Sequence, residues 1–207
     1  MTIFDTAATV DIARTLLGAT LRVGKTAGII VETEAYLADD PASHSCNGRS
    51  RRNGSMFLSA GHAYVYRSYG VHWCFNVVTG PAGVGEAVLV RALKPVDGIA
   101  TIAERRGIVW DGSDAFNIPA GGGAAMKALC SGPGKLCQAL GITGDMDGSV
   151  IGPDSPVSIT LPDRVTSDRA PAGILATERI GISKGKDRLY RFVPADGELR
   201  RWISRPK

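Results

Sequence analysis

The sequence predicts one domain of the mixed α/β (α+β) class, spanning residues 1–207. Of its 207 residues, 44% are hydrophobic and 21% are charged, which is typical of a folded globular protein. Segments in which apolar and polar residues alternate, as in half-buried strands, lie between segments in which apolar residues recur every three or four positions, as in helices. This mixture favours a sheet packed against helices.

The expected elements follow from these two periodicities. Asp5 is a candidate N-cap for a first helix, because Ala8, Ile12 and Leu16 after it have helical spacing. We expect further helices over residues 97–106 and 133–140, and strands over residues 21–23, 29–36, 64–66, 71–77 and 86–93 and in the stretches VSITL, RIGIS and YRFV. Residues 37–59 and the Gly-rich residues 107–125 are expected to be loops.

The cysteines predict neither a disulfide framework nor a metal site. The sequence has no C-x-x-C pair, and no cysteine stands at zinc-ligand spacing from a histidine. We expect reduced thiols, mostly in the core, at Cys46, Cys74, Cys130 and Cys137. Because no apolar run approaches about 20 residues and the N-terminus lacks the pattern of a signal peptide, we expect a cytoplasmic protein without membrane contact.

The charge distribution permits nucleic-acid binding. The net charge is +4, and basic residues gather before and within a predicted hairpin at residues 64–77. These residues are Arg49, Arg51, Arg52 and Arg67, and a second group, Arg200, Arg201, Arg205 and Lys207, closes the chain. Either group is a candidate for phosphate contacts or a solubilising surface.

Residues 29–36 predict a strand with two different faces. Glu32, Glu34 and Tyr36 share one face of it, and that face is either a polar edge toward solvent or part of a site. The hairpin carries Tyr66 on one arm and Tyr69 at its tip. A tyrosine at a hairpin tip either folds back as a lid over the core or inserts as a wedge between base pairs.

Two further features allow both a structural and a functional interpretation. Arg91 interrupts the apolar run VLVRAL and would be costly to bury without an acidic partner, for which Glu34 is the candidate. That ion pair is either structural or catalytic. The stretch 131–135, SGPGK, opens a helix whose free amide groups suit either a phosphate or simple capping.

Several long motifs together resemble the alkyladenine (3-methyladenine) DNA glycosylase family. They are VETEAY with a histidine eight positions after its tyrosine, RNGSMF, YVYRSYG, the strand that carries Asn76, VLVRAL and LCSGPGKLCQALGI. The resemblance runs from about residue 5 to the C-terminus. It implies a curved, largely antiparallel sheet flanked by helices, with a protruding β-hairpin.

The resemblance also implies a reaction and the residues for it. It implies a monofunctional glycosylase that flips a damaged purine out of duplex DNA and hydrolyses its N-glycosidic bond, without metal or cofactor. Its matching residues are Glu34 as general base and Arg91 as its partner, Tyr36, His44, Tyr66 and Asn76 around the base, and Tyr69 as the wedge. The interval from Tyr36 to His44 is one residue shorter than in mammalian relatives, which weakens the match at His44.

The partner expected from the resemblance is double-stranded DNA with a damaged purine, bound by a monomer. Two other functions fit the residues. One is a non-catalytic module that recognises DNA damage with the same hairpin and pocket, as would follow if Glu34 only neutralised Arg91. The other is a hydrolase or transferase for a small molecule, which leaves the exposed tyrosine hairpin unexplained.

Overall fold

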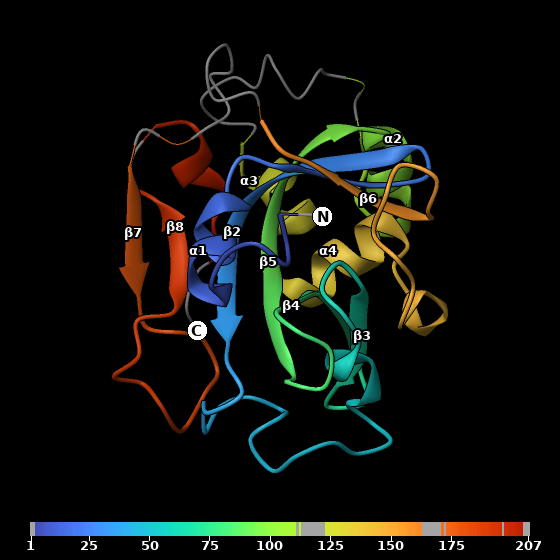
Figure 1. The fold of residues 1–207 in the computed structure, drawn as a ribbon. Helices are drawn as coiled ribbons and strands as arrows, with labels where there is room; N and C mark the ends of the chain where they lie inside the picture. The colour runs from blue at the N-terminus through green and yellow to red at the C-terminus, as the bar shows by residue number, and fades with distance from the viewer. Residues whose placement is uncertain are drawn as a thin grey trace.

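The computed structural model describes residues 3–110, 112, 123–162, 171, 173–195 and 197–204. They form a curved eight-stranded sheet in the order β3-β4-β5-β2-β1-β6, to which β8 adds through β2 and β7 adds through β8 (Figure 1). The named strands pair antiparallel throughout the described residues. The strands are β1 (Thr20–Val23), β2 (Thr26–Tyr36), β3 (Ala63–Ser68), β4 (His72–Thr79), β5 (Glu86–Asp97), β6 (Val157–Thr160), β7 (Ile174–Thr177) and β8 (Arg191–Pro194).

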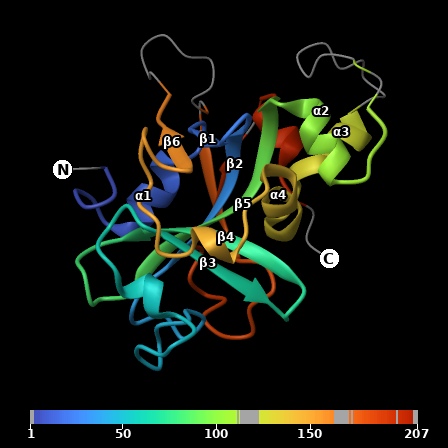
Figure 2. The same cartoon turned by 90° about the vertical axis from the view of Figure 1, so that its right-hand side faces the viewer.

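Helices flank the sheet on both sides. Figure 2 shows α1 on one side of β2 and β5, and α2, α3 and α4 on the other. The helices are α1 (Thr9–Thr15), α2 (Ile99–Arg105), α3 (Gly123–Cys130) and α4 (Pro133–Leu140), with short 3-10 turns η1 (Gly54–Phe57), η2 (Gly144–Met146) and η3 (Leu199–Trp202). The predicted α+β class, with its largely antiparallel sheet, is confirmed.

Strand β2 is the centre of the sheet, because β1, β5 and β8 all pair with it. Its two faces meet different surroundings, as the alternation predicts. On one face the hydroxyl of Thr33 donates a hydrogen bond of 2.7 Å to the carbonyl of Ala13 in α1. On the other, Glu32 and Glu34 are fully buried. A solvent-facing polar edge is therefore wrong for this strand.

The pairing of β2 with β5 is irregular next to Arg91. Glu32 pairs with Ala92 while the next residue, Thr33, pairs with Val90, so Arg91 in β5 and Val31 in β2 are both left without a cross-strand partner. Local irregularities of this kind change the direction of side chains. Arg91 stands at this point, and its side chain reaches both glutamates on β2.

The β3–β4 hairpin is confirmed, and it lies across the direction of β1 and β2 (Figure 2). Under its base lies a small hydrophobic cluster separate from the main core, consisting of Met56, Tyr64, Val78 and Ala87. Tyr36 and Tyr66 pack against this cluster. The hairpin thus brings its own tyrosines beside the end of β2.

Three local predictions are wrong. Asp5 does not cap α1, whose N-cap is Ala8 without a side-chain hydrogen bond. The stretch RIGIS is irregular, and the backbone N–H of its Ile180 donates to the Glu34 carboxylate in place of a neighbouring strand. Strand β7 at Ile174–Thr177 was not predicted. Helix α3 begins at Gly123, inside the predicted loop 107–125. Residues 111 and 113–122 of that loop, and Arg205 and Lys207 of the basic tail, lie outside the described residues.

All four cysteines are free; Cys46 is exposed and the other three are buried, as predicted. Within the described ranges, no helix has the length and apolar character needed to cross a membrane.

Candidate active site

A cavity of about 440 Å³ opens beside the hairpin. It receives residues from β2, β3, β4 and β5, from the loop after β2, from the start of α4 and from residues 180–182. Six of the seven predicted site residues line it, namely Tyr36, His44, Tyr66, Tyr69, Asn76 and Arg91. The seventh, Glu34, lies directly behind this lining, hydrogen-bonded to Tyr36 and Arg91.

The Glu34 carboxylate is fully buried and accepts three hydrogen bonds. The hydroxyl of Tyr36 (2.8 Å) and Nη1 of Arg91 (3.1 Å) donate to Oε2, and the backbone N–H of Ile180 donates to Oε1 (2.8 Å). Burial raises the pKa of Glu34, while Arg91, the Ile180 amide and the Tyr36 hydroxyl oppose that rise. A buried carboxylate with a raised pKa and an oriented cation has the properties of a general base.

Arg91 also contacts the first glutamate of β2. Its Nε lies 3.3 Å from Oε1 of Glu32, which is fully buried as well. Burial alone would lower the pKa of Arg91, but the charges of Glu34 and Glu32 raise it by more than burial lowers it. The guanidinium therefore keeps its charge. Arg191 of β8 donates through Nε to the same Oε1 of Glu32 at 2.6 Å. Two carboxylates and two guanidinium groups therefore share one buried cluster.

Aromatic rings form the walls of the cavity. The His44 ring packs edge-on against Tyr66 with centroids 4.5 Å apart, and the Tyr64 and Tyr66 rings stack at 5.3 Å. Nδ1 of His44 shares a hydrogen bond of 2.8 Å with the Tyr64 hydroxyl. The loss of water around the ring lowers the pKa of His44, and the charge of Arg52 lowers it further. The imidazole is therefore neutral near neutral pH.

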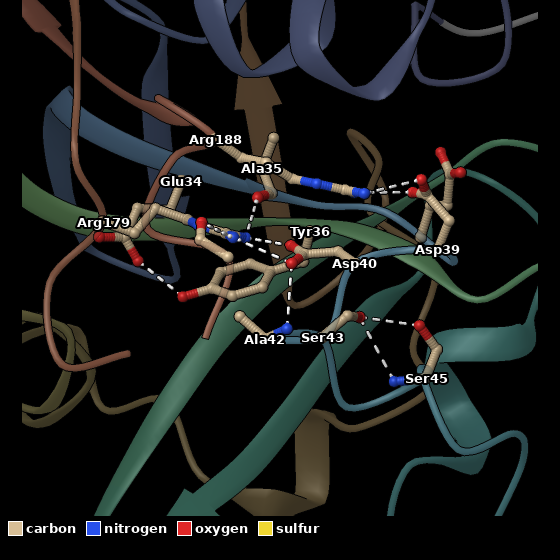
Figure 3. A network of polar contacts seen from close by, with 12 residues as sticks. Glu34, Ala35, Tyr36, Asp39, Asp40, Ala42, Ser43, Ser45, Arg179 and Arg188 are labelled. Atoms are coloured by element: carbon tan, nitrogen blue, oxygen red, sulfur yellow. Dashed lines mark hydrogen bonds and ion pairs between the residues drawn. The ribbon is translucent and has the colours of Figure 1, made fainter. Parts of the chain in front are cut away.

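Tyr36 is held from behind by Arg179, as Figure 3 shows. The Arg179 guanidinium lies 4.7 Å from the centre of the Tyr36 ring and forms a two-pronged ion pair with Asp40, whose side chain is also fully buried. Nη1 of Arg179 also donates to the carbonyl of Ala35 at 3.0 Å. Arg179 is buried and does not line the cavity, whereas Tyr36 does. The guanidinium therefore supports the ring from outside the cavity.

Asn76 is buried in the cavity wall with a fixed amide group. Its Nδ2 donates to the carbonyl of Tyr64 at 2.9 Å, across the β3–β4 pair. Neighbouring Cys74 has a thiol pKa raised by burial, so it is a neutral thiol. The wall at this point is therefore hydrogen-bonded and uncharged.

The hairpin tip differs from the rest of the cavity rim. Tyr69 is 89% exposed and has a positive φ of 50°, and Gly70 after it has a φ of 69°. The turn is closed by a 3.0 Å hydrogen bond from the Val71 amide to the Ser68 carbonyl. Two positive φ angles are what a tight hairpin turn requires, and only the second stands on glycine. The ring is thus presented outward and does not fold back over the core.

The basic side chains near the tip are partly ordered by the hairpin. Arg52 donates to the carbonyl of Arg67 at 3.0 Å, and the Arg67 guanidinium lies 5.3 Å from the Trp73 ring.

At the start of α4, Pro133 lines the cavity, and Gly134 packs so closely on His72 that a Cβ there would lie 2.7 Å from the His72 Cβ. Phosphate binding at this helix end stays a prediction.

Four residues around the site were not predicted. Asp40, Arg179, Ile180 and Arg191 come from segments far apart in the sequence, and their contacts span up to 159 positions. Only Arg191 carried a local signal, because it stands in the apolar strand YRFV as Arg91 stands in VLVRAL. Within the described part of the chain, no group of three or more His, Cys, Asp or Glu residues could hold a metal ion.

Comparisons with known proteins identify the family of the chain. Residues 3–198 match the family model for methylpurine-DNA glycosylase (MPG). A protein of Agrobacterium fabrum is 50% identical over 88% of this chain and 81% of its own length. One of Nitrosospira multiformis is 46% identical over 97% and 91%, and one of Methanoculleus marisnigri is 48% identical over 89% and 88%. All three bear the name "Putative 3-methyladenine DNA glycosylase". The chain belongs to the methylpurine-DNA glycosylase family.

Proposed function

We propose that this protein flips a damaged purine nucleotide out of duplex DNA into the cavity and hydrolyses its N-glycosidic bond with Glu34 as general base. Family membership makes the chain a DNA glycosylase of base excision repair, a hydrolase of N-glycosyl bonds. The lesion, the flipping step and the residue roles are the proposal. The observation that carries it is a buried carboxylate with a raised pKa behind an aromatic cavity, below an exposed tyrosine.

Access to the base requires that it leave the duplex, at a cost of a few kcal/mol that is smallest for damaged or mispaired bases. The exposed ring of Tyr69 is suited to fill the gap from the minor groove and hold the duplex open. The extruded base then lies between Tyr36 and Tyr66, beside His44. Each base–ring stack contributes about 1 to 3 kcal/mol, and a cationic alkylated purine gains more from the electron-rich rings.

Discrimination against guanine is assigned to the cavity wall at Asn76. Because the Asn76 amide is fixed by the Tyr64 carbonyl, it has no freedom to move aside for the exocyclic amine of guanine. A base without that amine, such as adenine or hypoxanthine, meets no such obstacle. We therefore assign Asn76 to selectivity against guanine.

The hydrolytic step transfers one proton, forms one bond and breaks another. Glu34 takes a proton from a water molecule while the oxygen of that water bonds to C1′ of the sugar. The C1′–N bond breaks, and its electron pair leaves with the base. Arg91 fixes the carboxylate, and the Ile180 amide holds the second oxygen. A cationic alkylpurine leaves without protonation, whereas hypoxanthine benefits from a proton.

The first test measures abasic sites in a duplex carrying one hypoxanthine and in methylated DNA, with a chelator present and Glu34→Gln alongside. We expect the wild type to form abasic sites and the variant to be slower by about 10² to 10⁴ while it keeps its affinity for the lesion. If wild type and variant bind lesions equally and neither releases a base, the protein recognises damage without catalysis and the proposal is wrong.

The rate should also depend on pH through Glu34. A general base must be ionised, and burial raises the pKa of this carboxyl above its ordinary value. The rate of base release should therefore fall as pH drops through that raised pKa, at a higher pH than for an ordinary glutamate. Single-turnover rates on hypoxanthine DNA across a pH series measure this acid limb. A rate independent of pH through this range would remove Glu34 from the step.

A further inference from the structure

Glu32 is buried as deeply as Glu34 but has no part in the reaction proposed above. Its side chain is fully buried at the centre of the sheet. Oε1 accepts from Nε of Arg191 at 2.6 Å and from Nε of Arg91 at 3.3 Å, and Oε2 accepts from the backbone N–H of Ser204 at 2.7 Å. A carboxylate that loses all its water needs such partners, and Glu32 shares one of them with Glu34.

The shared partner, Arg91, is held at two atoms of one rigid plane. Its Nε lies against Glu32 and its Nη1 donates to Glu34 at 3.1 Å. The guanidinium is planar, so fixing the direction of Nε also fixes the direction of Nη1. Without Glu32, Arg91 would keep only its hydrogen bond to Glu34 and could approach that carboxylate through any of its nitrogens.

We propose that Glu32 is a positioning residue for the glycosylase reaction. Glu32 directs the Arg91 guanidinium toward the Glu34 carboxylate and neutralises part of the positive charge of Arg91. The inference rests on the proposed role of Glu34 as general base. Glu32 touches neither the base nor the water in this assignment and acts through Arg91 alone. Arg191 and the Ser204 amide fix Glu32 from the opposite side.

The proposal has a consequence for pH dependence that a simple structural role lacks. The ionisable groups that act on or respond to Glu34 are Arg91, Tyr36, Glu32, Tyr66, Cys74 and Arg179. Burial raises the pKa of the two tyrosines and the thiol, which stay neutral, so they do not produce the acid limb. If Glu32 loses its charge, Glu34 loses a like charge nearby and gains the whole attraction of Arg91. Both changes lower the pKa of Glu34.

The test is Glu32→Gln, assayed for single-turnover release of hypoxanthine across a pH series, with separate measurement of binding to the lesion duplex. We expect the plateau rate to fall about 10- to 100-fold, because a misplaced catalytic group costs that much. We expect the acid limb to move to lower pH and the affinity for the duplex to stay unchanged. An unchanged plateau together with an unchanged limb would overturn the proposal.

Arg191→Met is the matched control, because it removes the other guanidinium from Glu32 without touching Glu34. It should lower stability, and it should not move the acid limb to lower pH, because Glu32 keeps its charge and then draws more strongly on Arg91. If it moves the limb to lower pH as Glu32→Gln does, Glu32 acts through general packing and the proposal is wrong. The double variant Glu32→Gln with Arg191→Met keeps the cluster's charge balance, and it should fold and show the same shifted limb if Glu32→Gln alone does not fold.

Failure to fold in both Glu32 variants would assign Glu32 a purely structural role and overturn the proposal. Failure of the proposed function gives a different result, because the wild type would then release no base and have no acid limb. A wild type that is active and depends on Glu34, beside a fully active Glu32→Gln, would refute only the inference about Glu32.

Discussion

The floor of the cavity and the tip of the hairpin are built on opposite principles. At the floor, Glu34 is fully buried and both of its oxygens are hydrogen-bonded, and Arg91 is only 7% exposed. At the tip, Tyr69 is 89% exposed and its backbone has a positive φ that a side chain disfavours. The floor lies between the two longest strands, whereas the tip projects from a two-stranded arm.

The difference reflects what each region does in the proposed reaction. Proton transfer to a carboxylate requires a group that is dehydrated and already oriented. The central strands of the sheet provide such a buried and fixed position. Insertion into a duplex requires a ring that its own protein leaves uncovered. Substitutions at the floor should therefore lower both activity and stability, whereas substitutions at the tip should lower activity without lowering stability.

The largest effect on both properties is expected at the floor, for Arg91→Met. The change leaves the Glu32 and Glu34 carboxylates buried beside one remaining guanidinium, and breaking a buried pair costs about 3 to 5 kcal/mol. Base release should fall as far as in Glu34→Gln. Urea denaturation and single-turnover assays measure the two losses.

Arg22→Met is the control for this change, because Arg22 forms an ion pair of 2.8 Å with Asp97 on the surface. Its loss should change the free energy of unfolding by at most about 1 kcal/mol and leave base release unaltered. If Arg91→Met and Arg22→Met cost the same stability, the floor is not the tightly coupled region described above.

The second effect is expected at the tip, for Tyr69→Asn. Asparagine tolerates a positive φ better than tyrosine does, so stability should rise by up to about 1 kcal/mol. Excision from duplex DNA should fall about 10- to 100-fold, corresponding to the loss of a stack of about 1 to 3 kcal/mol. Thermal unfolding measures the expected gain in stability, and excision kinetics measure the expected loss of activity.

The same variant on a lesion in single-stranded DNA provides the control, because no gap remains to be filled there. Its deficit on the single strand should be much smaller than on the duplex. An equal loss on both substrates, or a loss of stability, would mean that Tyr69 supports the cavity and is no wedge.

This contrast also explains which parts of the site could be predicted from the sequence. Tyr66 and Tyr69 lie on a local hairpin, so the alternation of YVYRSYG is enough to predict their positions. Arg91 was predicted from its apolar surroundings, since an arginine in a buried strand requires an acid. Its pairing with Glu34 is confirmed.

The remaining contacts depend on distances along the chain that periodicity does not encode. Arg179 reaches Asp40 across 139 positions, and both look like ordinary surface residues in the sequence. The strand predicted at RIGIS is wrong for a related reason, because the Ile180 amide donates to Glu34. The irregular pairing of β2 with β5 beside Arg91 is also invisible in VLVRAL, although the cation that contacts both glutamates stands there.

The smallest effect is expected on the exposed basic loop before the hairpin, for Arg51→Gln. Arg51 is exposed and lies next to Arg52, which is anchored on the hairpin through the Arg67 carbonyl. If Arg51 contacts a phosphate, its loss should weaken binding uniformly across sequences and reduce the slope of log K against log salt by about 1. The plateau rate of base release should not change, because the loop takes no part in the floor.

Lys25→Gln provides the charge-matched control for this last change. Lys25 is exposed in the turn between β1 and β2, at the opposite end of β2 from Tyr36. Its loss should leave the salt slope unaltered, since a lysine far from the cavity meets no DNA held there. Equal slopes for the two variants would show that Arg51 only contributes net charge. A slope reduced in Arg51→Gln alone would extend the DNA-binding surface from the tyrosine tip to this loop, and would separate the residues that hold DNA from those that cut the bond.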